Sequence, residues 1–412
     1  MIARRGFLKD AGITAVGLSM VPAFLQHAAL AAIPSTGSKK ILVTIFQRGG
    51  ADGLNIVVPH GDDFYYEHRP SIAIRRPDPQ RPSVLDLDGF FGLHPQLESL
   101  MPIYQAGDLA FVQAVGSPDS SRSHFEAQDY MESAAPGSKT VVSGWLNRYL
   151  QARPDAHATY FRATAMTETL PRSLHGEASA LAVGNLNTFG AVGGMSIYQS
   201  LYSDEANALL AGTARDLYGA VDMLEAADPK QYRPAEGVRY PTGQNAQFST
   251  KLQQVAQLIK ADIGLEIAFI DVGGWDHHQA EGGVEGRMAQ SLAQLGAPLA
   301  AFYQDLGARM EDVVVLTMSE FGRTVRENGN RGTDHGHGNV MFVMGGGING
   351  GKVYADWPGL APENLNENRD LAITTDFRDV FAEILVKHLN CSEPDKVFPD
   401  FELDARRFKG LV

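Results

Sequence analysis

Five short, mainly apolar runs recur along the chain, and such runs are typical of strands that are buried on both faces of a sheet. They span residues 39–46, 109–115, 266–272, 312–318 and 340–344. Segments with helical spacing of apolar residues lie between them, at residues 95–105, 123–133, 144–152, 250–261, 285–310 and 375–389. Strands that alternate with helices predict an α/β fold with a mostly parallel sheet sandwiched between helices.

The stretch of residues 186–247 breaks this alternation. It contains Gly, Tyr and Ala but no continuous strand pattern, so we interpret it as a helical insertion and not as a separate domain. A chain of 412 residues is long enough for one large domain or two ordinary ones. The pattern therefore predicts a single α/β domain over residues 33–412.

The first 32 residues resemble a twin-arginine export signal. Arg4 and Arg5 precede an apolar run at residues 11–25, and small residues follow it up to Ala31 and Ala32. The run is shorter than the ~20 residues that a membrane span needs, so we expect cleavage near Ala31 or Ala32 and no stable span afterwards. This predicts a periplasmic or secreted protein that meets the twin-arginine export machinery. A retained amphipathic helix and an uncleaved anchor are the alternatives.

Charge and cysteine content narrow the functional classes. Asp and Glu number 48 against 35 Lys and Arg, a net charge of -13, which argues against nucleic acid as the main partner. Loss of residues 1–32 would leave about -15. Cys391 is the one cysteine, so disulfide frameworks and Cys-rich metal sites are excluded. Any metal must be held by Asp, Glu and His.

Polar residues cluster where the predicted strands end, which is where ligands bind in open α/β sheets. The run at 266–272 leads into Asp271, Asp276, His277 and His278. Carboxylates and imidazoles this close together suit a divalent metal such as zinc or manganese, with calcium a further candidate. Asp271 and His277 are the favoured ligands and Asp276 is another, while His278 is expected to point away if His277 points in. The alternative is a polar turn that caps the next helix.

Other metal-ligand candidates follow or precede the remaining runs. His335 and His337 would share one side of an extended segment, unless they belong to a solvated turn. Asp52 is either a ligand or a turn residue. Glu320 follows a buried strand and needs a partner, which is either a metal or the nearby Arg323.

The segment before residue 124 suggests a nucleophile. Ser123 precedes a helical pattern, and with Glu126 it fits a capping box. A hydroxyl at a helix N-terminus also gains electrostatic help, so Ser123 is the candidate nucleophile, with Arg122 and His124 beside it as further catalytic candidates. The alternatives are a purely capping role for Ser123 and a surface carboxylate partner for Arg122.

Six segments carry a family resemblance. They occur in order at residues 46–55, 121–129, 271–277, 319–324, 332–339 and 374–379. Together they resemble the secreted domain-of-unknown-function family 1501, over essentially the whole mature chain. That family in turn resembles a distant branch of the alkaline phosphatase and sulfatase superfamily, which implies an alkaline-phosphatase-like fold.

The superfamily resemblance also implies roles for residues. Asp52 matches its carboxylate after the first strand and Ser123 matches the position of its nucleophile. Asp271 and His277 resemble its Asp and His ligands, with His335 or His337 as the later histidine. Phe321 stands where a histidine is expected, which puts a full second metal site in doubt. No cysteine is present to become formylglycine.

These observations predict an exported metal-dependent hydrolase of phosphate or sulfate esters, whose substrate is an anionic ester. The alternative is a non-catalytic secreted binding protein on a degenerate alkaline-phosphatase-like fold, and a redox or metal-storage role is weaker. Convergence of Asp52, Asp271, His277, Glu320 and His335 within metal-ligand reach would favour the hydrolase, and scattering of these side chains would favour the binding protein.

Overall fold

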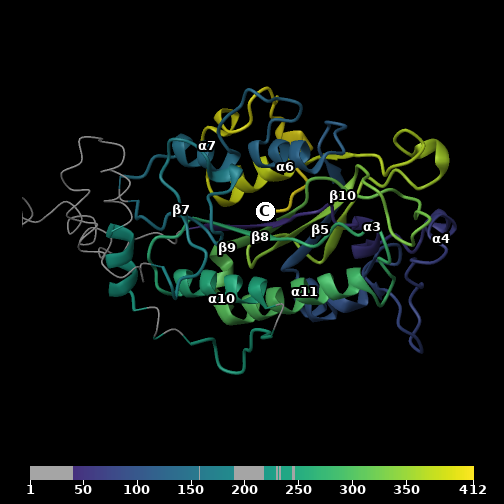
Figure 1. The fold of residues 1–412 in the computed structure, drawn as a ribbon, viewed down its shortest axis with the longest axis horizontal. Coiled ribbons are helices and arrows are strands. Elements are labelled where there is room, and N and C mark those ends of the chain that lie inside the picture. Colours follow the sequence, from purple (N-terminus) through teal and green to yellow (C-terminus); the bar gives the residue numbers. More distant parts are fainter. Residues whose placement is uncertain (1–39, 157, 190–217, 229–230, 232, 244–245) are drawn as a thin grey trace, which may run out of the picture.

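The computed structural model describes residues 40–156, 158–189, 218–228, 231, 233–243 and 246–412 (Figure 1). Its main sheet has nine strands among the described residues, in the order β11-β5-β10-β9-β1-β8-β6-β7, with β12 paired to β5. The long strands match the five predicted runs: β1 (Ile41–Gln47), β5 (Leu109–Gly116), β8 (Ile267–Val272), β9 (Val313–Met318) and β10 (Asn339–Met344). The shorter strands are β6 (Ala163–Ala165), β7 (Leu181–Ala182), β11 (Lys352–Tyr354) and β12 (Thr375–Asp376).

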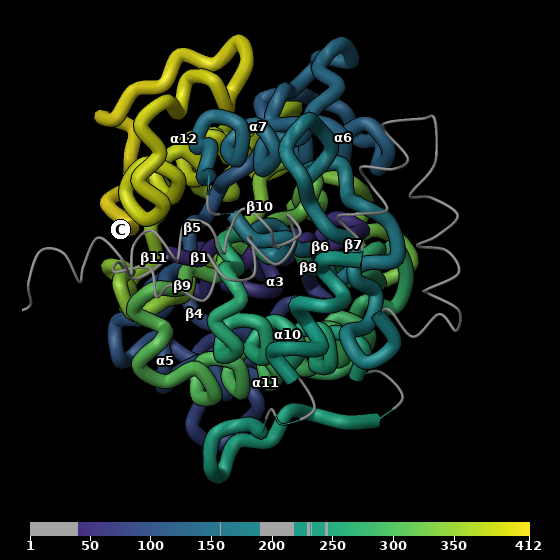
Figure 2. Tube along the Cα trace, turned by 90° about the vertical axis from the view of Figure 1, so that its left-hand side faces the viewer, coloured from purple at the N-terminus to yellow at the C-terminus, as the bar shows by residue number. Residues whose placement is uncertain are grey.

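Helices cover both faces of the sheet (Figures 1 and 2). One face carries α6 (His124–Ser133), α7 (Trp145–Ala152) and α12 (Phe377–Glu383), which continues as a π-helical turn at Ile384–His388. The other face carries α5 (Met101–Ala106), which follows a 3₁₀ segment at Pro95–Leu100, together with α10 (Gln247–Lys260) and α11 (Arg287–Leu306). The predicted α/β sandwich is confirmed.

Strand β1 shows why the sheet needs two layers of helices. Val43 and Ile45 belong to the core shared with α10 and α11, whereas Leu42 and Phe46 belong to the core shared with α7 and α12. Successive side chains of a strand point to opposite faces, so a continuously apolar strand must be covered on both. Each fully buried side chain of this kind contributes about 1.5–3 kcal/mol to folding.

The register brings the loops that carry the candidate residues to one edge. Phe46 of β1 pairs with Asp271 of β8 and with Met318 of β9, all parallel. Strand β10 is antiparallel to both β9 and β5, because residues 319–338 return to the sheet without a crossover helix. The whole 319–338 loop therefore lies at the carboxyl edge of β1, β8 and β9.

Smaller elements complete the described chain. A second sheet contains β2 (Val57–Val58), β4 (Gly92–Leu93) and β3 (Leu85–Asp86), beside α3 (Gly53–Ile56) and α4 (Asp63–His68). The predicted signal at residues 1–32 lies outside the described residues, as does much of the predicted insertion, of which residues 218–226 are helical. In the described part of the chain, no helix is both long and apolar enough to cross a membrane.

Candidate metal centre

Three side chains from different segments converge at the carboxyl edge of the sheet. His124 is the first residue of α6, Asp276 follows β8, and His335 lies in the loop between β9 and β10. Each offers one ligand atom within 4.8 Å of the other two. Asp276 Oδ1 lies 3.6 Å from His124 Nε2 and 3.5 Å from His335 Nε2. These separations are close to the ~3.3 Å edge of a tetrahedral zinc site.

The outer nitrogens of the two imidazoles are already bonded, which leaves Nε2 of each ring facing the cluster. His335 Nδ1 donates to the carbonyl oxygen of Arg122 at 2.7 Å. His124 Nδ1 donates to Glu320 Oε1 at 2.8 Å. His124 Nε2 is buried and finds no hydrogen-bond partner among the described residues. Metal-binding histidines in proteins almost always have their other N–H bonded in this way.

A third imidazole, His278, borders the same point. Its Nε2 lies 2.9 Å from His335 Nε2 and 3.1 Å from Asp276 Oδ1, and its Nδ1 lies 3.1 Å from Asp334 Oδ1. His277 turns the other way: it is 2% exposed, and its Nε2 lies 3.4 Å from Ser291 Oγ. We expected His277 to point into the site and His278 to point away. The structure shows the reverse orientation, because the turn after Trp275 buries His277 and leaves His278 at the cluster.

Arg323 supports Asp276 from inside the protein. Its buried guanidinium contacts Asp276 Oδ1 at 2.6 Å and also donates to the carbonyl oxygens of Gly49, Gly50 and Thr333. Burial opposes ionisation of Asp276, but the hydrogen bond and charge of Arg323 outweigh it and lower the pKa of the carboxyl. Arg323 thus ties together three loops of the site, and the expected ion pair with Glu320 is replaced by one with Asp276.

Glu320 lies behind His124, and it does not reach the centre of the cluster. Its side chain is fully buried, and Oε1 accepts hydrogen bonds from Gly49 N at 2.8 Å and Gln128 Nε2 at 2.9 Å, besides the bond from His124. Burial raises its pKa, but these donors outweigh burial and lower the pKa. Glu320, expected as a metal ligand, therefore orients a ligand candidate.

Two further expected ligands lie in ion pairs outside the cluster. Asp52 is 1% exposed and forms a two-pronged ion pair with the buried guanidinium of Arg69. Asp271 lies between Arg48, at 3.2 Å from its Nε, and Lys251, at 3.0 Å from its Nζ. Asp271 lies near the end of β8 and Asp52 follows β1, but cations from other parts of the chain neutralise both carboxylates.

Of the three expected catalytic residues, His124 belongs to the cluster, while Ser123 and the side chain of Arg122 do not. Ser123 stands at the N-cap position of α6, but within the described chain its hydroxyl makes no capping bond. Glu126 instead accepts a hydrogen bond from Ser121 Oγ at 2.9 Å, so the capping box was wrong. Arg122 pairs with Asp370 and Glu367, each at 2.6 Å. Its carbonyl oxygen, and not its guanidinium, reaches the cluster.

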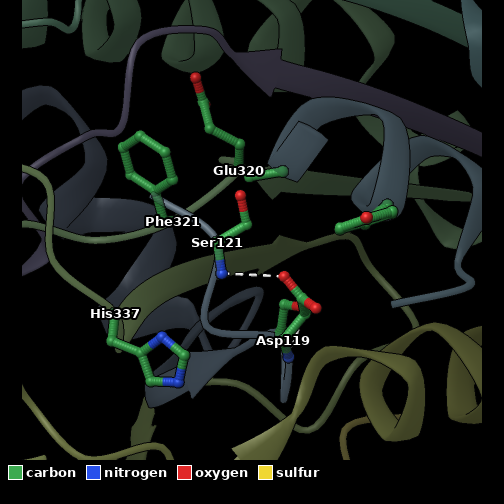
Figure 3. A pocket seen from close by; sticks show the side chains of 8 residues that line it. Asp119, Ser121, Glu320, Phe321 and His337 are labelled. Atoms are coloured by element: carbon green, nitrogen blue, oxygen red, sulfur yellow. Dashed lines mark hydrogen bonds between the residues drawn. The ribbon is translucent and has the colours of Figure 1, made fainter. Parts of the chain in front are cut away.

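His337 lies apart from His335, in a small pocket that Figure 3 shows. The backbone of this segment folds against residue 322 across the loop: Gly336 N donates to Gly322 O at 2.8 Å, and Gly322 N donates to His337 O at 2.9 Å. Phe321 lines this pocket, and its ring centroid lies 4.7 Å from that of His335 and 4.9 Å from that of His124. The pocket is lined by Ser117, Asp119, Ser121, Ala127, Tyr130, Glu320, Phe321 and His337.

The sequence interpretation did not select two residues that the structure places here. Asp334 holds His278, and Gln128 holds Glu320. Gln128 follows His124 by four residues, and this spacing places both side chains on one face of a helix. That spacing was a usable signal for Gln128, whereas the contact of Asp334 depends on how two loops meet.

Comparison with known proteins identifies the family. The family model described as "Protein of unknown function (DUF1501)" matches residues 38–400. The chain belongs to the DUF1501 family. The family predicted from the six sequence segments is thereby confirmed. No curated protein sequence matches this DUF1501 chain significantly.

Several solved structures resemble the DUF1501 chain at low identity. One is the C-terminal periplasmic domain of EcEptC from Escherichia coli in complex with Zn, at 10% identity and TM-score 0.35, covering 76% of this chain and 75% of that one. A second is the lipoteichoic acid synthase LtaP from Listeria monocytogenes, at 9% identity and TM-score 0.33, covering 81% of this chain and 72% of that one. A third is the PsFucS1 sulfatase from Pseudoalteromonas sp., at 11% identity and TM-score 0.34, covering 81% of this chain and 68% of that one.

Proposed function

We propose that this DUF1501 protein is a metal-dependent hydrolase of phosphate or sulfate esters. The observation that carries the proposal is the convergence of His124 Nε2, His335 Nε2 and Asp276 Oδ1, with both outer ring nitrogens already bonded. These three residues would hold one divalent metal, and His278 stands beside them as a fourth donor. A bound metal would polarise an oxygen of the ester and stabilise its negative charge.

The chemistry of the donors supports zinc or manganese. Imidazole nitrogens suit zinc and a carboxylate suits manganese, whereas calcium takes oxygen ligands almost exclusively. The charges also fit a divalent cation: Asp276, Glu320 and Asp334 are acidic, and Arg323 is the basic side chain paired to Asp276. With neutral histidines these four groups leave two negative charges, which one divalent ion balances.

The residues of α6 would supply the nucleophile and hold the anion. Ser123 is the N-cap residue of α6 and directly precedes His124, so its hydroxyl is the candidate nucleophile at a helix N-terminus. The free N–H groups of a first helical turn favour a negatively charged group. Arg122 would not clamp the anion, because Asp370 and Glu367 occupy its guanidinium. Its carbonyl oxygen would orient His335 instead.

Metal analysis and a substrate panel test the proposal. The purified protein is expected to contain about one zinc or manganese per chain, and His335→Ala is expected to lose it. With the metal present, we expect turnover of an aryl phosphate, a phosphodiester or an aryl sulfate, and strong loss of turnover in Ser123→Ala. Absence of a stoichiometric metal contradicts the metal centre. A metal-loaded protein that turns over none of these esters contradicts the hydrolase.

A non-catalytic binding protein is the second candidate. Three observations favour it. Of the five side chains expected to converge, only His335 belongs to the cluster. Arg69 neutralises Asp52, and two acidic side chains occupy Arg122. This candidate predicts the same metal content and no turnover. The substrate panel therefore separates the two functions.

We also propose that the protein is exported by the twin-arginine route, on the strength of Arg4 and Arg5 before the apolar run at 11–25. Replacement of both arginines by lysine is expected to retain the protein in the cytoplasm. Cell fractionation of the two forms measures this, and equal export of both contradicts the route.

A further inference from the structure

Gln128 contacts both Glu320, which lies behind the candidate metal centre, and Arg48, which forms ion pairs with Glu132 and Asp271. It is on α6, four residues after His124, so both side chains lie on one face of the helix. Its Nε2 donates to Glu320 Oε1 at 2.9 Å, the same oxygen that accepts from His124 Nδ1 at 2.8 Å. Gln128 and His124 thus grip one buried carboxylate from the same helix.

The orientation of the Gln128 amide is fixed by its two neighbours. Arg48 Nη1 donates to Gln128 Oε1 at 3.0 Å, and an arginine can only donate. The ionised Glu320 can only accept, so the NH₂ group must face it. Arg48 is itself held by Glu132 at 3.0 Å and by Asp271 at 3.2 Å.

This chain of contacts determines the tautomer of His124. Because the donors from Gln128 and from the backbone of Gly49 hold Glu320 Oε1 in place, this oxygen accepts a hydrogen bond from the nearest ring nitrogen of His124, which is Nδ1. The neutral imidazole then carries its proton on Nδ1 and keeps a lone pair on Nε2. Nε2 is the buried atom that faces Asp276 and His335.

We propose that Gln128 is a positioning residue for the metal centre, which acts through Glu320 to hold His124 in the tautomer that presents Nε2 as a ligand. The proposal deepens the proposed function, because it assumes that Nε2 of His124 binds the metal. Gln128 touches neither metal nor substrate. Its NH₂ group fixes Glu320 by donating to Oε1, and its carbonyl oxygen only accepts the hydrogen bond from Arg48.

Two variants separate these halves of the amide. Gln128→Glu keeps the oxygen that accepts from Arg48 and loses the NH₂ group that donates to Glu320. Gln128→Met has a similar length and loses both. Gln151→Met is the matched control, because Gln151 is likewise a helical glutamine whose Nε2 donates to a side-chain oxygen, that of Asn147 on α7 at 2.7 Å. Thermal unfolding of each variant verifies that it folds.

Zinc affinity is the first measurement, by calorimetric titration of the purified metal-free protein with Zn²⁺ alone. Gln128→Glu and Gln128→Met are both expected to weaken binding about 10–100-fold, the range seen when partners of ligands are changed. Gln151→Met is expected to bind as the wild type does. Wild-type affinity in Gln128→Glu, with a loss in Gln128→Met, would overturn the proposal, because it would assign the effect to Arg48.

The tautomer of His124 is the second measurement, by nitrogen NMR of metal-free protein labelled in histidine and assigned with His124→Asn. The wild type is expected to carry the proton on Nδ1, and both Gln128 variants are expected to populate the Nε2 tautomer. An unchanged tautomer in both variants would overturn the role of Gln128. A wild type that binds neither Zn²⁺ nor Mn²⁺ would contradict the proposed function, and the tautomer would still decide the role of Gln128.

Discussion

The guanidinium of Arg323 lies 2.6 Å from Asp276 Oδ1 and is completely buried, while the carboxylate that it holds is about half exposed, at 47%. Its remaining N–H groups are bonded to backbone carbonyl oxygens, among them those of Gly50 and Thr333. A planar fork of five N–H donors on three nitrogens can reach acceptors on several loops, whereas the ammonium of lysine has three donors on a single nitrogen. Arg323 therefore connects the loops after β1 and β8 with the loop before β10.

Replacement of this arginine is expected to weaken both the fold and the metal centre. Arg323→Met leaves buried carbonyl oxygens without donors, and each such loss costs about 1–3 kcal/mol. We expect the free energy of unfolding to fall by at least about 3 kcal/mol in urea titrations.

The matched control is Arg309→Met. Arg309 forms an exposed ion pair with Asp262 at 2.9 Å, so its loss is expected to change stability by less than about 1 kcal/mol. Equal effects of the two substitutions would contradict the connecting role of Arg323.

The neighbouring histidines of the loop after β8 are expected to respond in opposite ways. His278→Gln removes an imidazole from the edge of the cluster, so zinc affinity should fall by about tenfold or more with little change in stability. His277→Gln alters a buried side chain whose Nε2 faces Ser291, so the unfolding temperature should fall while zinc binding persists. Calorimetric titration with Zn²⁺ and thermal unfolding of both variants measure the two effects. Loss of zinc binding in His277→Gln alone would restore the order expected from the sequence.

The sequence contained enough information for the sheet and the layers of helices, because burial on both faces leaves apolar runs such as the one in β9. It also placed the candidate residues correctly at the ends of strands. It could not show which of them meet. Asp52 and Arg69 are both polar loop residues in the sequence, and their pairing depends on how α4 packs beside α3.

The sequence also could not predict the direction of a side chain in an irregular loop, because that direction depends on which other segments the loop contacts. His335 and His337 would share a face in a regular strand, but the backbone between them bonds to Gly322. Two imidazoles two residues apart therefore reach different places. Periodicity predicts direction only where the backbone is regular.

The stability of the protein is expected to fall between about pH 7.5 and about pH 5, with His94 among the causes. Burial lowers the pKa of His94 to about 4, below its ordinary value of 6.5. Its Nε2 donates to Gly283 O, and its Nδ1 accepts from Gln96 N, so a second proton would break the latter bond. In this window the unfolded chain binds the proton and the folded chain does not, so stability decreases as the pH falls.

His94→Asn isolates this contribution. Asparagine can still accept from Gln96 N at the N-cap position but does not titrate. The loss of unfolding free energy between the two pH values is expected to be smaller in the variant by about 2 kcal/mol, measured in urea. An identical pH dependence in wild type and variant would assign the effect to other groups.

A substitution of Asp52, the carboxylate after the first strand, tests whether this residue belongs to the metal centre or only stabilises the fold. It is buried in an ion pair with Arg69, whose Nη2 lies 3.0 Å from Oδ1. Removal of the Asp52 charge takes away the main counter-charge of Arg69, so Asp52→Asn is expected to lower the free energy of unfolding by about 3 kcal/mol. Burial and Asp52 raise the pKa of the neighbouring Glu281, so this carboxyl can ionise in the variant and replace part of the lost charge. Zinc affinity should be unchanged, because the carboxylate lies outside the cluster of His124, Asp276 and His335.

The double variant Asp52→Leu with Arg69→Met tests the cause of that loss. Apolar side chains in place of a buried pair are often neutral or stabilising, so the double variant should recover at least half of the stability that Asp52→Asn loses. Urea titrations and zinc calorimetry on the same samples separate the two roles. If Asp52→Asn binds no zinc while its stability is unchanged, Asp52 is a ligand and the ion pair with Arg69 gives way when the metal binds. If stability falls and zinc affinity persists, Asp52 anchors the loop after β1 and the metal depends on the histidines and Asp276.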